Sequence, residues 1–119
     1  MKTFEDLKVY EKAIDFTVEI FQLTEKSSIN LNIKNQLERA ALSISNNISE
    51  GFELQSNRQF VKFLYYSKGS SGECRNILTV VYRLKQIKPE IYNDLKNKTI
   101  EISKQLANFI KYLQKSDIN

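Results

Sequence analysis

The chain offers few side chains capable of acid, base or nucleophilic chemistry. It contains no histidine and a single cysteine, Cys74, among its 119 residues. These counts exclude histidine-dependent catalytic triads and the common zinc sites, and one cysteine cannot form an intrachain disulfide. The helical spacing places Cys74 on an apolar side, where we expect a small buried hydrophobic residue rather than a reactive thiol.

The remaining motifs that could carry chemistry are incomplete. Residues 68–72, Lys-Gly-Ser-Ser-Gly, resemble the Gly-x-x-Gly loop of KH domains, but the strands of that fold are missing. Glu50 and Glu73 do not make a di-metal set, which requires Glu-x-x-His pairs. No P-loop and no dinucleotide fingerprint occurs. The sequence therefore predicts a protein that is not an enzyme, with no cofactor, no metal and no small-molecule substrate.

Basic residues are concentrated in one stretch of a chain whose formal net charge is +4. Between residues 54 and 88, seven basic residues stand against Glu73 alone, a local charge of +6. Cations around an aromatic side chain are how grooves for non-specific nucleic-acid binding are built. A solvated charged face is the alternative explanation in a single subunit. The residues predicted to contact RNA or DNA are Arg58, Lys62, Tyr65, Lys68, Arg75 and Arg83.

Long amphipathic runs must position these side chains, and they predict an all-α fold. Three glycines and one proline are too few for the many turns of an all-β protein. We expect helices at about residues 4–26, 33–52, 57–87 and 89–114. Short connections between them favour an up-down-up-down antiparallel four-helix bundle, a single domain over residues 1–119.

Two glycine-containing segments bear on the helix boundaries. Gly51 suits a C-cap position at the end of the second helix, because a left-handed conformation carries no penalty there. Residues 67–72 are poor helix formers and could form a loop that splits the third helix. The apolar spacing keeps its phase from Phe63 through Cys74 to Val81, however, and favours one continuous helix.

The first helix carries two apolar stripes, more than one core contact usually needs. One stripe, expected to face the core, contains Leu7, Tyr10, Ile14, Val18 and Phe21. The other stripe is predicted to pack against another subunit, because little else in a small bundle would cover it. Deep burial among the chain's own helices is the alternative. This second stripe is Val9, Ala13, Phe16 and Ile20.

The second helix has a polar stripe opposite its apolar side, formed by Arg39, Ser43, Asn46 and Glu50. A solvated face is one interpretation of this stripe. A second interpretation is a polar seam at a subunit interface, formed by Arg39, Asn46 and Glu50. A third interpretation is a ligand site.

The second helix also carries a family pattern. It resembles Arg-Ala-Ala-x-Ser-Ile-x-x-Asn-Ile-x-Glu-Gly, and residues 60–64, residues 69–73 and the opening at residues 4–9 match further blocks of the same family. The chain is thus similar to the bacterial four-helix-bundle proteins of the 23S rRNA intervening-sequence family, also called the S23 family. The pattern is matched at Arg39, Ala40, Ala41, Ser43, Ile44, Asn47, Ile48, Glu50 and Gly51.

The resemblance implies a four-helix bundle, a ring-shaped homopentamer and a tie to RNA. Some family members are encoded within intervening sequences of rRNA genes. A related accessory protein of diversity-generating retroelements is a basic pentameric barrel that works with a reverse transcriptase and nucleic acid. The sequence departs from the family at Leu54, where an arginine often stands.

No apolar run approaches the roughly 18 residues of a membrane span, and charges stand where a signal peptide would be apolar. We therefore expect a cytoplasmic protein without a membrane partner. Two functional hypotheses remain open. One is a nucleic-acid-binding ring that uses the basic face of the third helix. The other is an oligomeric scaffold that docks another protein.

Overall fold

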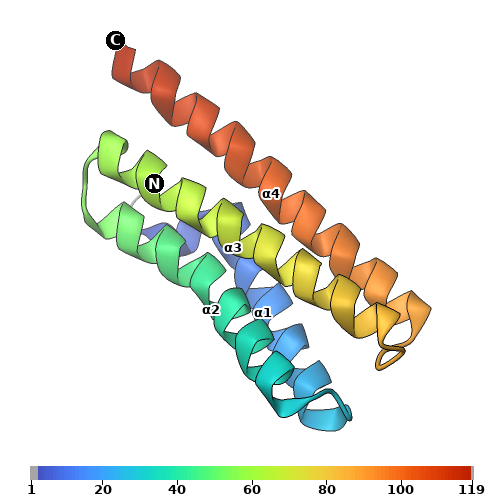
Figure 1. Cartoon of the computed structure of the whole chain (residues 1–119). Helices are drawn as coiled ribbons and strands as arrows, with labels where there is room; N and C mark the ends of the chain where they lie inside the picture. Colours follow the sequence, from blue (N-terminus) through green and yellow to red (C-terminus); the bar gives the residue numbers. More distant parts are fainter. Residues whose placement is uncertain (1–2, 119) are drawn as a thin grey trace.

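The computed structural model describes residues 3–118 of the chain, with side chains as far as Ser116, and within them it contains four α-helices and no strand (Figure 1). The helices are α1 (Lys8–Lys26), α2 (Leu31–Glu53), α3 (Asn57–Arg83) and α4 (Pro89–Ile118). They form an elongated antiparallel bundle of 50 × 20 × 19 Å. The predicted all-α four-helix bundle is confirmed.

Side-chain caps fix where the helices begin. Asn30 accepts hydrogen bonds from the backbone N–H groups of Asn32 and Ile33, so α2 begins at Leu31. Ser56 accepts one from the N–H of Gln59 and opens α3. The capping box of Thr3 and Asp6 closes a single 3₁₀ turn, η1 (Phe4–Asp6), rather than the first α-helix.

The predicted ends of three helices required correction. Helix α2 continues through Gly51 to Glu53, so Gly51 is not a C-cap. The residue with a left-handed conformation in the following turn is Gln55, with φ 53°. Helix α3 ends at Arg83 rather than near residue 87, because Lys85 adopts a left-handed φ of 61°. Helix α4 extends beyond the predicted residue 114 to Ile118.

Helix α3 is continuous through its glycines and serines, as the apolar phase predicted, and lies between α2 and α4 (Figure 1). The Ser67 hydroxyl donates to the carbonyl oxygen of Ile44 in α2 at 2.7 Å. The Ser71 hydroxyl donates to that of Thr99 in α4 at 2.9 Å. Both serines are fully buried. Small side chains with satisfied hydroxyls thus allow α3 to approach both neighbours closely.

The two apolar stripes of α1 do not lie as predicted. Val9, Ala13, Phe16 and Ile20 are at most 5% exposed within the chain's own core, so the prediction that they form an outer stripe against another subunit was wrong. Val18 and Phe21 lie outside instead, 49% and 38% exposed.

The physical reason for this arrangement of α1 is its two buried threonines. The Thr17 hydroxyl donates to the carbonyl oxygen of Ala41, and the Thr24 hydroxyl to the carboxylate of Glu38. These bonds turn the side of α1 that carries the threonines towards α2. In α4, Ile91 is likewise 37% exposed, although its spacing had placed it in the core stripe.

Gly51 marks the closest approach of α2 to α3. A Cβ atom added there would lie 2.6 Å from the Cβ of Phe63 and 3.0 Å from the Phe60 ring. No heavy atom lies within 4 Å of a Cβ added at Gly69 or Gly72. A side chain therefore has no room at Gly51, whereas Gly69 and Gly72 both have room for one.

We expect Gly51→Ala to lower the free energy of unfolding by about 1–3 kcal/mol, because two rigid groups would have to move apart. In contrast, Gly69→Ala and Gly72→Ala should each raise it by up to about 1 kcal/mol, since alanine is the better helix former in open space. Chemical denaturation of the three variants checks this prediction. Equal stability of all three would contradict the close approach at Gly51.

Candidate nucleic-acid interface

The outer face of α3 carries the cations singled out in the sequence. Arg58, Lys62 and Arg83 are exposed, and Tyr65 among them is 52% exposed. At about 100° per residue these four side chains fall within roughly 60° of one another around the helix axis. From Arg58 to Arg83 the face is about 38 Å long at 1.5 Å per residue. The structure therefore brings these four residues onto one long surface, named here the α3 face.

The other two predicted residues lie to one side of the α3 face. Lys68 is exposed, whereas Arg75 is partly buried towards α4. Tyr66 was not singled out in the sequence, yet it is 49% exposed and the Nζ of Lys62 lies 6.0 Å from its ring centroid. Its edge contact with Phe63 holds the ring in place. The signal that could have found it is the i, i+4 spacing of Lys62 and Tyr66.

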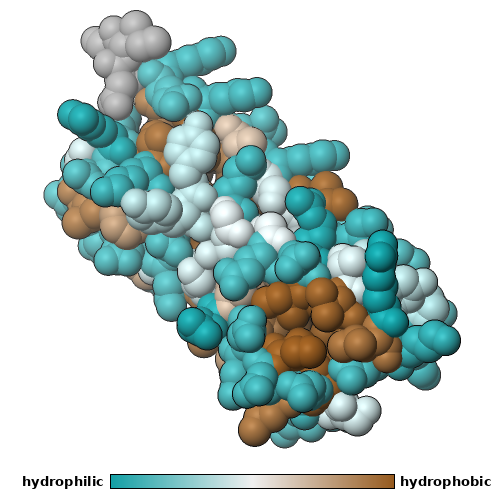
Figure 2. Space-filling view, viewed as in Figure 1, coloured by the Kyte–Doolittle hydropathy of each residue, from teal (hydrophilic) through white to brown (hydrophobic). Residues whose placement is uncertain are grey.

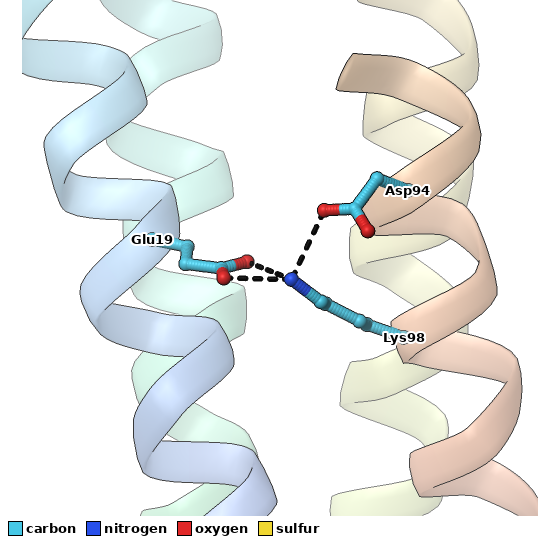
Figure 3. Close-up of polar contacts among 3 residues, drawn as sticks. All are labelled: Glu19, Asp94 and Lys98. Carbon is cyan, nitrogen blue, oxygen red and sulfur yellow. Dashed lines mark hydrogen bonds and ion pairs between the residues drawn. The ribbon is translucent and has the colours of Figure 1, made fainter. Parts of the chain in front are cut away.

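The cations of the α3 face have no ionic partner among the residues that the structure describes. In that part of the chain, ion pairs form only around Lys98 of α4, whose Nζ lies 2.6 Å from Glu19 of α1 and 3.0 Å from Asp94 (Figure 3). Glu73 is the single acidic residue within α3. The charge of the α3 face is therefore available to an external anion.

The Lys98 cluster joins α1 to α4. These two helices pack against one another less extensively than α2 and α3 do. The hydrogen bonds that the Lys98 ammonium donates to Glu19 and then to Asp94 raise its pKa above the ordinary value of 10.5. Since the folded-state pKa is the higher one, the stabilisation is complete below the ordinary pKa of 10.5 and is lost as the pH rises through the raised pKa of the folded state.

We expect Lys98→Met to lower the free energy of unfolding by about 0.5–1 kcal/mol at neutral pH, because water screens this half-exposed cluster. The difference from the wild type should shrink above about pH 11, where the wild-type lysine also loses its proton. Denaturant titrations at neutral and alkaline pH measure both values. A difference that is independent of pH would contradict the electrostatic origin.

Cys74 is fully buried, as its place on the apolar side of α3 predicted. Burial, with a smaller contribution from the charge of Glu73, raises the pKa of its thiol to about 12. The thiolate that attacks electrophiles is therefore scarce at neutral pH. Cys74 fills space in the core and offers no nucleophile to the surface.

Iodoacetamide should accordingly modify Cys74 at least about 100-fold more slowly in the native protein than in the unfolded chain at pH 8. Mass spectrometry of the quenched reaction gives both rates. Rapid modification without loss of structure would show an accessible thiol.

The polar stripe of α2 is divided in the structure. Arg39, Asn46 and Glu50 are exposed, but the Ser43 hydroxyl accepts a hydrogen bond from Ser70 of α3 at 2.8 Å. Asn47 also donates to Ser43. Ser43 therefore belongs to the contact between α2 and α3, and only the other three side chains are free to face solvent or a partner.

Apolar side chains interrupt the polar surface in two places. Ile33, Ile77, Val80 and Leu84 gather where the beginning of α2 runs beside the end of α3, and Val80 and Leu84 are 42% and 52% exposed. Figure 2 shows hydrophobic residues clustered on this face. The second place is the edge between α1 and α2.

Among the described residues, no three His, Cys, Asp or Glu side chains lie close enough together to hold a metal ion. No helix in the same part of the chain combines the length and apolarity that crossing a membrane requires.

Comparison with known proteins identifies a family and a similar solved structure. The family model of the 23S rRNA-intervening sequence protein matches residues 5–108. A crystal structure from Bacteroides thetaiotaomicron, described as a protein of unknown function from the S23 ribosomal protein family, is similar with a TM-score of 0.82 and 28% sequence identity. The similarity covers 87% of this chain and 98% of that one. No curated protein matches the sequence significantly.

Proposed function

The chain belongs to the 23S rRNA-intervening sequence protein family, and on that premise we propose that it is a non-enzymatic protein that binds RNA or DNA through the α3 face. The proposal includes a homo-oligomer, a pentameric ring as the family resemblance implies. The protein would contact the sugar–phosphate backbone of the nucleic acid and would bind independently of the nucleotide sequence. Such binding depends on cations that follow phosphates and on aromatic rings on which bases stack.

The observation that supports this function most directly is the uncompensated charge of the α3 face. Arg58, Lys62 and Arg83 form no ion pair in the described chain, whereas Lys98 on the other side of the bundle has two carboxylate partners. Two exposed rings, Tyr65 and Tyr66, lie among these cations. A protein with no anionic ligand would gain little from such a row of unpaired charges.

Assembly would multiply this charge. Each subunit carries +4, so a pentamer would carry about +20 and would attract nucleic acid strongly at low salt. The interface itself must differ from the one predicted in the sequence, because Val9, Ala13, Phe16 and Ile20 are buried in the subunit.

The edge between α1 and α2 is the better candidate for a subunit interface. Thr17 bonds to Ala41 across this edge, so the next residues of the two helices, Val18 and Leu42, lie at the same level. They are 49% and 43% exposed, and Phe21 extends the same apolar surface. Mass measurement in solution tests assembly, and a monomer of 13.9 kDa would remove this part of the proposal.

The alternative function is that of a scaffold that docks another protein. The observation that favours it is the exposed apolar pair Val80 and Leu84, because Val80 lies in the same sector of α3 as Lys62 and places an apolar side chain on the α3 face itself. The two functions differ in their dependence on the cations of the α3 face.

We expect the triple variant Arg58→Glu, Lys62→Glu and Arg83→Glu to bind a single-stranded oligonucleotide at least about 30-fold more weakly than the wild type at 50 mM salt. Fluorescence anisotropy of a labelled strand measures this. The matched control is Lys8→Glu, Lys104→Glu and Lys111→Glu, which changes the total charge equally at exposed positions on α1 and α4.

The control variant should retain affinity within a few-fold of the wild type. Equal losses in the two triple variants would mean that only net charge matters and would contradict a site on α3. No binding by the wild type at this salt concentration would reject nucleic-acid binding and leave the scaffold function.

A further inference from the structure

The fold leaves two apolar patches exposed, one on each side of α2. The first lies on the edge between α1 and α2 and is named here the α1/α2 patch; it consists of Ile14, Val18, Phe21 and Leu42. The second lies where the beginning of α2 runs beside the end of α3 (Figure 2). It is named the α2/α3 patch and consists of Ile33, Ile77, Val80 and Leu84. The described chain closes neither patch, since Val18, Leu42, Val80 and Leu84 are each more than 40% exposed.

The α1/α2 patch is bordered by carboxylates. Glu11 and Glu25 stand seven residues before and after Val18, so both lie on the same side of α1, within roughly 20° of it. Both are exposed. On α2, Glu38 precedes Leu42 by about one turn. The lysines of α1 lie roughly 80° or more from Val18 around the helix axis, so the border of this patch is acidic.

The α2/α3 patch has the opposite charge at its border. Arg83 and Lys85 flank Leu84 in the chain, and both are exposed. The first two turns of α2, residues 31–37, bring no carboxylate to this patch. Glu73, about two turns before Val80, is the single carboxylate within α3. This patch is therefore apolar with a mainly basic border, which complements the acidic border of the α1/α2 patch.

We propose that the α1/α2 patch of one copy of the chain binds the α2/α3 patch of a second copy. The apolar side chains of the two patches pack together at the centre, as in the cores of other protein interfaces. At the edge, Glu11 and Glu25 of one copy meet the cations beside Leu84 of the other, which fixes the orientation of the two copies. Pairing either patch with its own kind would bring like charges together and is disfavoured.

This contact is heterologous, because it joins two different surfaces. A copy that binds a neighbour through one patch keeps its other patch free for the next copy. The exposed side chains of Arg39, Asn46 and Glu50 on α2 lie between the two patches by helical spacing, so both patches can be occupied at once. A ring with an odd number of copies needs such a contact, since isologous pairing alone cannot build it. The pairing thus deepens the homo-oligomer of the proposed function and does not depend on nucleic-acid binding.

Most of the α3 face stays accessible in this arrangement. Lys62 stands 18 residues before Val80, which is about 27 Å along α3 at 1.5 Å per residue. Arg58 and Tyr65 lie in the same half of α3 as Lys62. Assembly and oligonucleotide binding can therefore be measured separately.

Sedimentation of the full-length chain and of two patch variants tests the pairing. Val18→Asp with Leu42→Asp disables the α1/α2 patch, and Val80→Asp with Leu84→Asp disables the α2/α3 patch. Each variant alone should self-associate at least about 100-fold more weakly than the wild type. An equimolar mixture should form a heterodimer of twice the subunit mass of 13.9 kDa and nothing larger, because one intact patch of each kind remains.

The matched control is Leu54→Asp with Tyr112→Asp, which adds the same charge at two exposed apolar positions outside both patches. It should assemble like the wild type, and circular dichroism shows whether each variant is folded. Glu11→Lys with Glu25→Lys is a second test that leaves the apolar side chains in place. Its association should be roughly tenfold weaker than that of the wild type at about 50 mM salt, with a smaller difference at about 500 mM.

Three results would overturn the pairing. Assembly of the Val80→Asp, Leu84→Asp variant like the wild type would mean that the α1/α2 patch binds its own kind or another surface. A mixture of the two patch variants that stays monomeric would exclude contact between the two patches. A monomeric wild type would leave the α2/α3 patch to a foreign protein and would remove the homo-oligomer from the proposed function, while oligonucleotide binding by the α3 face would be unaffected.

Discussion

The close packing of α3 against both α2 and α4 is the constraint on which the rest of the structure depends. It is achieved where the sequence is least helix-like, at Ser67 and Ser71 within residues 67–72. Buried hydroxyls of Ser67 and Ser71 donate to backbone carbonyls of the two neighbouring helices, so no polar atom there is left unsatisfied. Larger side chains at these positions would push the helices apart. The segment that weakens the isolated helix is therefore the one that makes the bundle possible.

This packing also determines which part of the surface can act. With both flanks covered, α3 exposes one face only, and Arg58, Lys62 and Arg83 fall on that face. Charges elsewhere are partly compensated, most clearly at Lys98, which joins α4 to α1 where the bundle is held less tightly. The proposed function uses what remains, the outside of α3.

Much of this arrangement could be predicted from the sequence, and the exceptions have physical causes. The unbroken apolar phase predicted that α3 runs through its glycines, and the caps at Asn30 and Ser56 follow from side-chain chemistry. The orientation of α1 could not be predicted, because both stripes are apolar and the deciding bonds of Thr17 and Thr24 reach across to α2. Gly51 was misassigned since its role is close approach, which periodicity does not reveal.

The salt dependence of binding to a single-stranded oligonucleotide tests the central claim most directly. Each neutralised phosphate of a single strand contributes about −0.7 to the slope of log K against log salt. Contacts from Arg58, Lys62, Lys68 and Arg83 in even one subunit predict a slope of about −3 or steeper between 50 and 200 mM. A slope near zero would show that the cations of α3 do not engage phosphates, and would contradict the account.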